Sequence, residues 1–221
     1  GLVAKAFHWL TALLIFGLLS VGFFMADMGV NPAKLQLYAL HKSFGILVLM
    51  LAVLRISWKL ANTKPVPLAT HQSWERGLSG ATHFLLYTLL IAMPLSGIFM
   101  SWAGGFPPKF FGIFSLPTPI EKNRAFFALT REAHEIFAWV ILAIVALHMA
   151  GAFKHHFLDR DETLRRMTVA RLGFTGGAIL ALAAGILWFT PVFFVLNSED
   201  EDIPSQQETV ATQADSETPA I

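Results

Sequence analysis

Long runs of apolar residues, separated by short polar segments, dominate the chain. Five runs reach the ~20 residues that an α-helix needs to cross a bilayer. They lie at about residues 6–26, 38–60, 78–102, 132–154 and 172–196. Turn-forming or charged segments stand between them, namely NPAK, PVP, GGFPP, LPTP and DRDE. The pattern predicts an all-α, polytopic membrane protein.

Composition supports this fold class and narrows the chemistry. Of 221 residues, 55% are hydrophobic and only 14% are charged, and the mean hydropathy is +0.58, which is too apolar for a soluble domain of this size. The chain has no cysteine. Disulfides, thiolate ligands, iron–sulfur clusters and covalent haem attachment are therefore excluded, whereas haem held by histidine or methionine is not.

The two ends differ in character. The chain begins with Gly1 and turns apolar at once, without the basic n-region or cleavage site of a secretory signal. We interpret this as a first membrane helix that lacks a few preceding residues. Residues 197–221 hold seven acidic residues and no basic one, which predicts a disordered tail. The alternative is a linker to a further periplasmic domain.

The distribution of Lys and Arg predicts the orientation. If the N-terminus is inside, ten basic residues lie on the inner side and six on the outer side, as the positive-inside rule favours. We therefore expect a multi-pass protein of a bacterial inner membrane, with a cytoplasmic N-terminus and a periplasmic C-terminus.

Four histidines form the most informative pattern. His134 and His148 are fourteen residues apart in one apolar run. On a helix this spacing brings both rings to the same face, about 21 Å apart along the axis. His8 matches the depth of His148 in the first span, and His41 matches that of His134 in the second. The pattern predicts two haem irons, one held by His8 and His148 and one by His41 and His134; structural or proton-handling roles are the alternative.

Other polar residues near the span ends suggest further contacts. His83 and His155 lie near the inner edge, where imidazoles could bind and protonate a quinone head; interfacial anchoring is the alternative. His156 is a weaker candidate.

Cations near the membrane edges could pair with haem propionates or simply snorkel to the surface: Arg55, Arg76, Arg131 and Lys42. Small residues near the ligands could admit a porphyrin or simply pack helices: Gly17, Gly22, Gly45, Gly97 and Gly151.

Four stretches together resemble prokaryotic cytochrome b561. They are FHWLTALLI, LHKSFGILVLMLAVLRISWKL, HFLLYTLLIAMPLSGIFMSWAGG and HEIFAWVILAIVALHMAGAFKHHFLDRDETLRRM, covering about residues 5–167. The resemblance implies a four-helix bundle with two haem b groups, ligated as the depth pattern predicts, and a quinone pocket that uses His83 and His155. A fifth span and an acidic tail depart from the compact members of the family. We expect a haem domain at 1–171, an additional helix at 172–196 and the tail at 197–221.

The predicted function is electron transfer between a periplasmic-side donor and ubiquinone. One member of the family oxidises superoxide, and outer-side cations could steer that anion: Lys42, Lys122, Arg124 and Arg131. Lipid and ubiquinone or ubiquinol are the expected partners, and nucleic acid is not. One alternative is a haem-bearing anchor subunit of a dehydrogenase or hydrogenase. Another is a metal or proton transporter, which the lack of acidic residues near the span centres disfavours.

Overall fold

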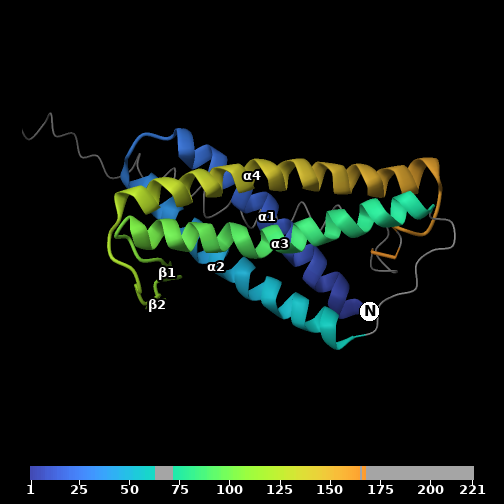
Figure 1. Ribbon diagram of the computed structural model, residues 1–221, viewed down its shortest axis with the longest axis horizontal. Helices are drawn as coiled ribbons and strands as arrows, with labels where there is room; N and C mark the ends of the chain where they lie inside the picture. The colour runs from blue at the N-terminus through green and yellow to red at the C-terminus, as the bar shows by residue number, and fades with distance from the viewer. Residues whose placement is uncertain (63–71, 165, 168–221) are drawn as a thin grey trace, which may run out of the picture.

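The computed structural model describes residues 1–62, 72–164 and 166–167, and four long helices make up most of it (Figure 1). These are α1 (Leu2–Asp27), α2 (Pro32–Ala61), α3 (Ser73–Ala103) and α4 (Arg124–Phe153), followed by a π-helical turn, η1 (Lys154–Leu158). Each is long and apolar enough to cross a membrane. The predicted all-α polytopic fold is thus confirmed, while the fifth span and the tail lie outside the described residues.

Helices α2, α3 and α4 start earlier than the apolar runs because polar residues cap their first turns. The Asn31 side chain accepts a hydrogen bond from the Lys34 amide at 2.8 Å, and Pro32 occupies the first helical position. Asn123 caps α4 in the same way through the Phe126 amide. At α3, Gln72 and Glu75 form a reciprocal capping box. Such caps satisfy backbone N–H groups that have no partner within the helix.

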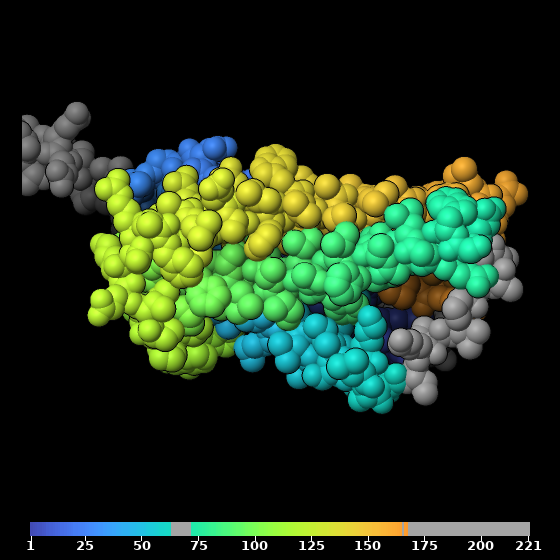
Figure 2. Space-filling view, in the orientation of Figure 1, coloured from blue at the N-terminus to red at the C-terminus, as the bar shows by residue number. Residues whose placement is uncertain are grey.

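Successive helices run in opposite directions along the long axis of the molecule (Figure 1). One end of the bundle carries the N-terminus, the end of α2 and the start of α3, and we call it the N-terminal end. The opposite end carries the start of α2, the end of α3 and the start of α4. Close packing joins α1 to α2, α2 to α3 and α3 to α4. The surface is hollowed between α2 and α3 toward the N-terminal end (Figure 2).

A small β-hairpin between α3 and α4 was not predicted from the sequence. Its strands, β1 (Lys109–Phe110) and β2 (Phe114–Ser115), are antiparallel, with Phe110 opposite Phe114. The tight turn places Phe111 and Gly112 at φ values of +46° and +74°. Strands of only two residues leave little periodic signal in the sequence. The hairpin packs mainly against α2. We call this end of the bundle the hairpin end.

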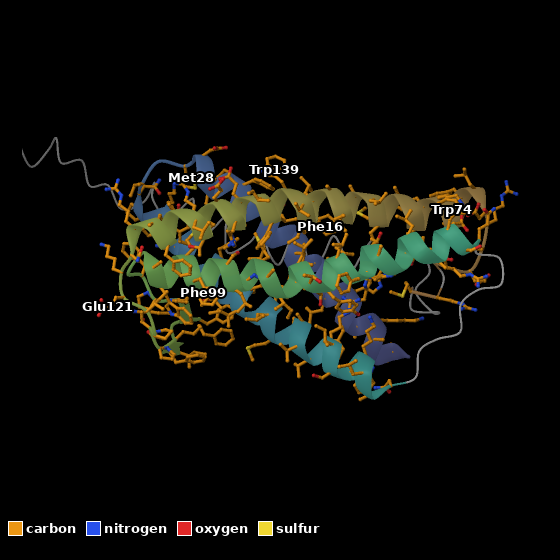
Figure 3. The ribbon with its side chains drawn as sticks, in the orientation of Figure 1. Phe16, Met28, Trp74, Phe99, Glu121 and Trp139 are labelled. Carbon is orange, nitrogen blue, oxygen red and sulfur yellow. The ribbon has the colours of Figure 1, made fainter. Side chains whose placement is uncertain are left out.

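The bundle has a narrow core and a broad apolar surface. One buried cluster joins α1, α2 and α3 around Leu14, Ala52 and Leu90, and another joins α1, α3 and α4 around Leu19, Leu89 and Ile141. Large side chains point outward as well, including Trp139 on α4, which is 56% exposed (Figure 3). An apolar surface of this kind is what a lipid-facing helix bundle presents.

Candidate functional site

At the hairpin end, α2 and α4 bring His41 and His134 together across the bundle. Their ring centroids lie 6.2 Å apart. Two imidazoles that share a metal, each bonded at about 2 Å, place their centroids about 6 Å apart. The two residues that the sequence paired by depth therefore stand at a separation that suits a metal between them.

The second nitrogen of His134 is fixed by α3. His134 Nδ1 lies 2.9 Å from Ser96 Oγ and 3.2 Å from the Met93 carbonyl oxygen. Ser96 itself donates to that carbonyl at 2.7 Å. Because both partners can accept from Nδ1–H, they favour the tautomer whose Nε2 lone pair is open to a metal. Sequence reasoning left this partner unidentified, since Ser96 and Met93 become neighbours of His134 only through packing.

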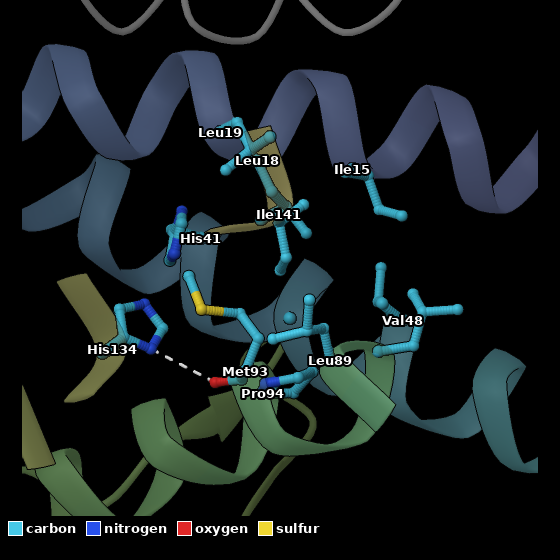
Figure 4. Close-up of a pocket in the computed structure, with 12 residues that line it drawn as sticks. Ile15, Leu18, Leu19, His41, Val48, Leu89, Met93, Pro94, His134 and Ile141 are labelled. Carbon is cyan, nitrogen blue, oxygen red and sulfur yellow. Dashed lines mark hydrogen bonds between the residues drawn. The ribbon is translucent and has the colours of Figure 1, made fainter. Parts of the chain in front are cut away.

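An apolar pocket opens beside these two rings (Figure 4). Helices α1, α2, α3 and α4 all contribute to its wall, and the empty space in it is about 460 Å³, including the part open to the outside. Its lining includes Leu18, Val48, Leu89 and Ile141. A wall of this composition suits contact with an apolar ligand.

Glycines sit directly against both rings. A Cβ at Gly22 would lie 3.3 Å from His41 Cε1, and one at Gly97 would lie 3.1 Å from His134 Cε1. A Cβ at Gly45, which lines the pocket, would meet nothing within 4 Å. Gly22 and Gly97 therefore give room to the histidines, whereas Gly45 leaves space in the pocket itself.

Near the N-terminal end, α1 and α4 bring His8 and His148 together. Their ring centroids are 6.1 Å apart, again the spacing that a shared metal requires. His83 on α3 adds a third ring, 5.3 Å from His148. Arg55 on α2 places Nη2 3.2 Å from His8 Nδ1. The site is thus built by all four helices.

Both pairs fit a b-type haem in the chemistry of their donors. Each offers two imidazoles on different helices, and the chain has no cysteine that could act as a thiolate ligand in their place. At the hairpin end, His41 Nδ1 and Trp102 Nε1 are the buried side-chain polar atoms of the described chain that have no protein partner. A buried polar atom without a partner is costly, and one of the two belongs to the candidate ligand His41.

The other predicted quinone residue, His155, belongs to a charged cluster on η1. Its Nδ1 lies 2.9 Å from Asp161 and 3.0 Å from Asp159. Burial raises the pKa of the Asp161 carboxyl, but hydrogen bonds from Thr163 and the neighbouring His155 outweigh it, so this pKa lies below its usual value. These carboxylates were not predicted from the sequence; the run HHFLDRDE carried the signal, since Asp159 and Asp161 follow His155 by only four and six residues.

Glu75 joins this cluster from α3 through a lysine. Lys154 Nζ lies 2.7 Å from Glu75 and 2.7 Å from Asp159. Glu75, His155 and Asp159 are close enough together to hold a metal ion, but the Lys154 ammonium already pairs with both carboxylates. We therefore interpret the cluster as a charged latch between α3 and η1.

The cations predicted on the outer side all lie at the hairpin end. Lys42 Nζ donates to the Phe106 carbonyl at 3.3 Å, and the Lys122 side chain runs past Gly105. Arg124 and Arg131 are exposed on α4. The hairpin end therefore presents positive charge near the His41–His134 pair.

Comparison with known proteins gives one consistent result. A family model described as prokaryotic cytochrome b561 matches residues 1–169. "Cytochrome b561 homolog 2" of Escherichia coli K12 is 34% identical over 168 residues, which are 76% of this chain and 89% of that protein. "Probable superoxide oxidase CybB" of Yersinia pestis is 27% identical over 169 residues, or 75% of this chain and 93% of that protein.

Proposed function

Because the chain belongs to the prokaryotic cytochrome b561 family, whose members are haem b proteins of membrane electron transfer, we propose that it holds two haem b groups. His41 and His134 ligate one at the hairpin end, and His8 and His148 ligate the other near the N-terminal end. The observation that carries the proposal is the presence of two imidazole pairs, at 6.2 and 6.1 Å, at two depths of one bundle.

Haem iron with two imidazole ligands supplies one-electron redox chemistry and has no open position for oxygen. The chain's own residues provide the rest. Ser96 and Met93 hold His134 in one tautomer, and the apolar wall around Val48 and Ile141 keeps water away. Fourteen residues of α4 set the two sites about 21 Å apart along the helix axis.

Haem content tests this assignment. We expect two haems per chain in a pyridine haemochrome assay, and one in each of the His134→Ala and His148→Ala variants. His156→Ala is the matched control, because His156 meets Phe157 edge to face and its removal should leave both haems in place. A chain without stoichiometric haem, or a His134→Ala variant that keeps two, would refute the assignment.

We further propose that the N-terminal end faces the cytoplasm of a bacterial inner membrane and the hairpin end faces the periplasm. The ten-to-six distribution of basic residues supports this orientation. An electron donor would then meet the hairpin end first. Superoxide is the candidate donor, because a relative is named a probable superoxide oxidase and because several cations, Lys42 among them, lie at this end. Such charges attract a small anion.

Ubiquinone is the proposed acceptor at the N-terminal end. Two superoxide anions would release two electrons and leave two oxygen molecules, and the electrons with two cytoplasmic protons would reduce ubiquinone to ubiquinol. Glu75 lies beside His155, and His83 follows Glu75 by eight residues of α3, or about 12 Å along the axis. A quinone ring with a hydrogen bond at each carbonyl spans roughly 11 Å, which is close to this separation.

Rapid mixing of the purified protein tests the two reactions separately. Superoxide should reduce the haems in the wild type, and ubiquinone should reoxidise them. His83→Ala and His155→Ala should slow reoxidation about tenfold or more, the scale expected for general acid catalysis, without slowing reduction by superoxide. His156→Ala again serves as the control. If the protein retains both haems but reacts with neither superoxide nor ubiquinone, the alternative of a haem-bearing anchor subunit is favoured.

A further inference from the structure

Arg55 occupies an unusual position beside a proposed iron ligand. It lies on α2 and is half-buried, with Nη2 3.2 Å from His8 Nδ1. Its Cζ lies 5.2 Å from the centre of the Tyr87 ring on α3. The guanidinium is thus held between the two helices that flank the hollow at the N-terminal end (Figure 2).

The contact between Arg55 and His8 depends on where the His8 proton is. A guanidinium has only hydrogen-bond donors, so His8 Nδ1 must act as the acceptor and the proton of neutral His8 must be on Nε2. A neutral histidine that binds a metal through Nε2 carries its proton on Nδ1 instead. Two donors would then face each other at 3.2 Å, which is unfavourable. Ligation of iron through Nε2 and the contact with Arg55 therefore exclude each other.

In the described part of the chain, Arg55 forms no ion pair with a carboxylate. Among residues 1–62, 72–164 and 166–167, no carboxylate pairs with Arg55 or with Lys59. Lys59 Nζ lies 4.2 Å from the centre of the same Tyr87 ring, so two cations contact one aromatic ring. A half-buried cation is stabilised by an anionic partner, and a haem held by His8 and His148 would bring carboxylates to this part of the bundle.

We infer that Arg55 leaves His8 Nδ1 and pairs with a carboxylate of the haem when His8 becomes an iron ligand. The inference rests on the proposed function, since it requires haem between His8 and His148. Arg55 is then a positioning residue, because it holds the haem and releases the second nitrogen of the ligand. The hairpin-end pair has no counterpart to this exchange, since Ser96 and Met93 can both accept from His134 Nδ1. A lipid phosphate is the competing anion at this membrane edge.

The test uses the full-length protein with His134→Ala, which should retain only the haem at the N-terminal end. Arg55→Gln and Arg55→Lys are added to this background, and Lys59→Gln is the matched control because Lys59 contacts Tyr87 without contacting His8. Resonance Raman propionate modes and redox-difference infrared carboxylate bands report on the haem carboxylate. Electron paramagnetic resonance g-values report on the axial imidazoles.

In Arg55→Gln we expect the propionate bands to shift and the midpoint potential to fall, because a positive charge is lost. The g-values should stay unchanged. Arg55→Lys, which keeps the charge but not the planar fork, should shift the bands less, and Lys59→Gln should leave them in place.

Altered g-values with unmoved propionate bands would overturn the inference, since Arg55 would still be acting on His8. If the propionate bands do not move and the midpoint potential varies with the anionic lipid content of the membrane, the partner of Arg55 is a lipid phosphate. Absence of haem from the His134→Ala parent would instead refute the proposed function.

Discussion

At the scale of single residues, the proposed ligands differ in what their second nitrogen meets. His134 has two acceptors on α3, and His8 faces the guanidinium of Arg55. His41 Nδ1 lies beside Gly22 without a partner. Partners of this kind orient a ligating imidazole and raise its basicity. The two proposed haems should therefore have different midpoint potentials, although their ring separations are nearly equal.

The close approach of Gly97 to His134 gives a residue-level prediction. Gly97→Ala places a methyl group 3.1 Å from His134 Cε1, so the ring must shift, at a cost of about 1–3 kcal/mol. We expect the haem content to fall from two toward one per chain. Gly80→Ala on the same helix is the control, because a Cβ there meets nothing within 4 Å. Full haem content with an unchanged spectrum in Gly97→Ala would contradict this prediction.

At the scale of elements, the hairpin is attached to α2 two residues beyond a proposed ligand. Ser43 Oγ accepts from the Phe111 amide and lies 3.0 Å from the Lys109 carbonyl. The rings of Phe44 and Phe111 meet edge to face at 5.0 Å. Phe44 follows His41 within one helical turn, so the hairpin covers α2 close to the depth of the His41–His134 pair. The hairpin therefore packs on α2 next to this site.

Removing the Ser43 hydroxyl should loosen the hairpin. In Ser43→Ala the Phe111 amide loses its acceptor, a change worth about 1 kcal/mol. We expect the Phe111 amide to exchange hydrogen roughly fivefold faster, as measured by hydrogen–deuterium exchange. Ser20→Ala is the comparison, because that hydroxyl donates to the Phe16 carbonyl on its own helix. Equal exchange at Phe111 in the two variants would show that the aromatic contacts alone hold the hairpin.

At the scale of the whole molecule, an even number of antiparallel spans puts both ends of the four-helix bundle on one side. The N-terminus, the end of α2 and η1 all lie at the N-terminal end (Figure 1). The charged latch of Lys154, Glu75 and Asp159 lies there too. One side of the membrane would thus hold the proposed quinone residues and the other the proposed donor surface.

The absence of native cysteine makes this orientation directly measurable. Single cysteines are placed at Leu60, which is 81% exposed at the N-terminal end, and at Ile113, which is 77% exposed on the hairpin. In intact spheroplasts we expect a membrane-impermeant maleimide to label Ile113→Cys and not Leu60→Cys. Lysed membranes should label both, as the accessibility control. The reverse pattern would invert the proposed orientation.

Much of the fold follows from local sequence because the membrane restricts the choices. A backbone in hydrocarbon must satisfy its own hydrogen bonds, so an apolar run of about 20 residues can only be a helix. The spacing of His134 and His148 likewise fixes their relative depth, since a helix has a constant rise. The hairpin escaped prediction because side chains of α2 hold its short strands, and the Asp161–His155 contact escaped because it depends on the path after η1.

The sequence by itself determined the four membrane helices, the family and the depth of each histidine, because these depend on composition and helical periodicity. The tertiary structure decided which atoms meet. It set the 6.1 and 6.2 Å ring separations, the place of Ser96 and Met93 behind His134, and the contact of Arg55 with His8. Such contacts join residues from different helices, and their distances depend on how the helices pack, which no periodicity within a single helix records.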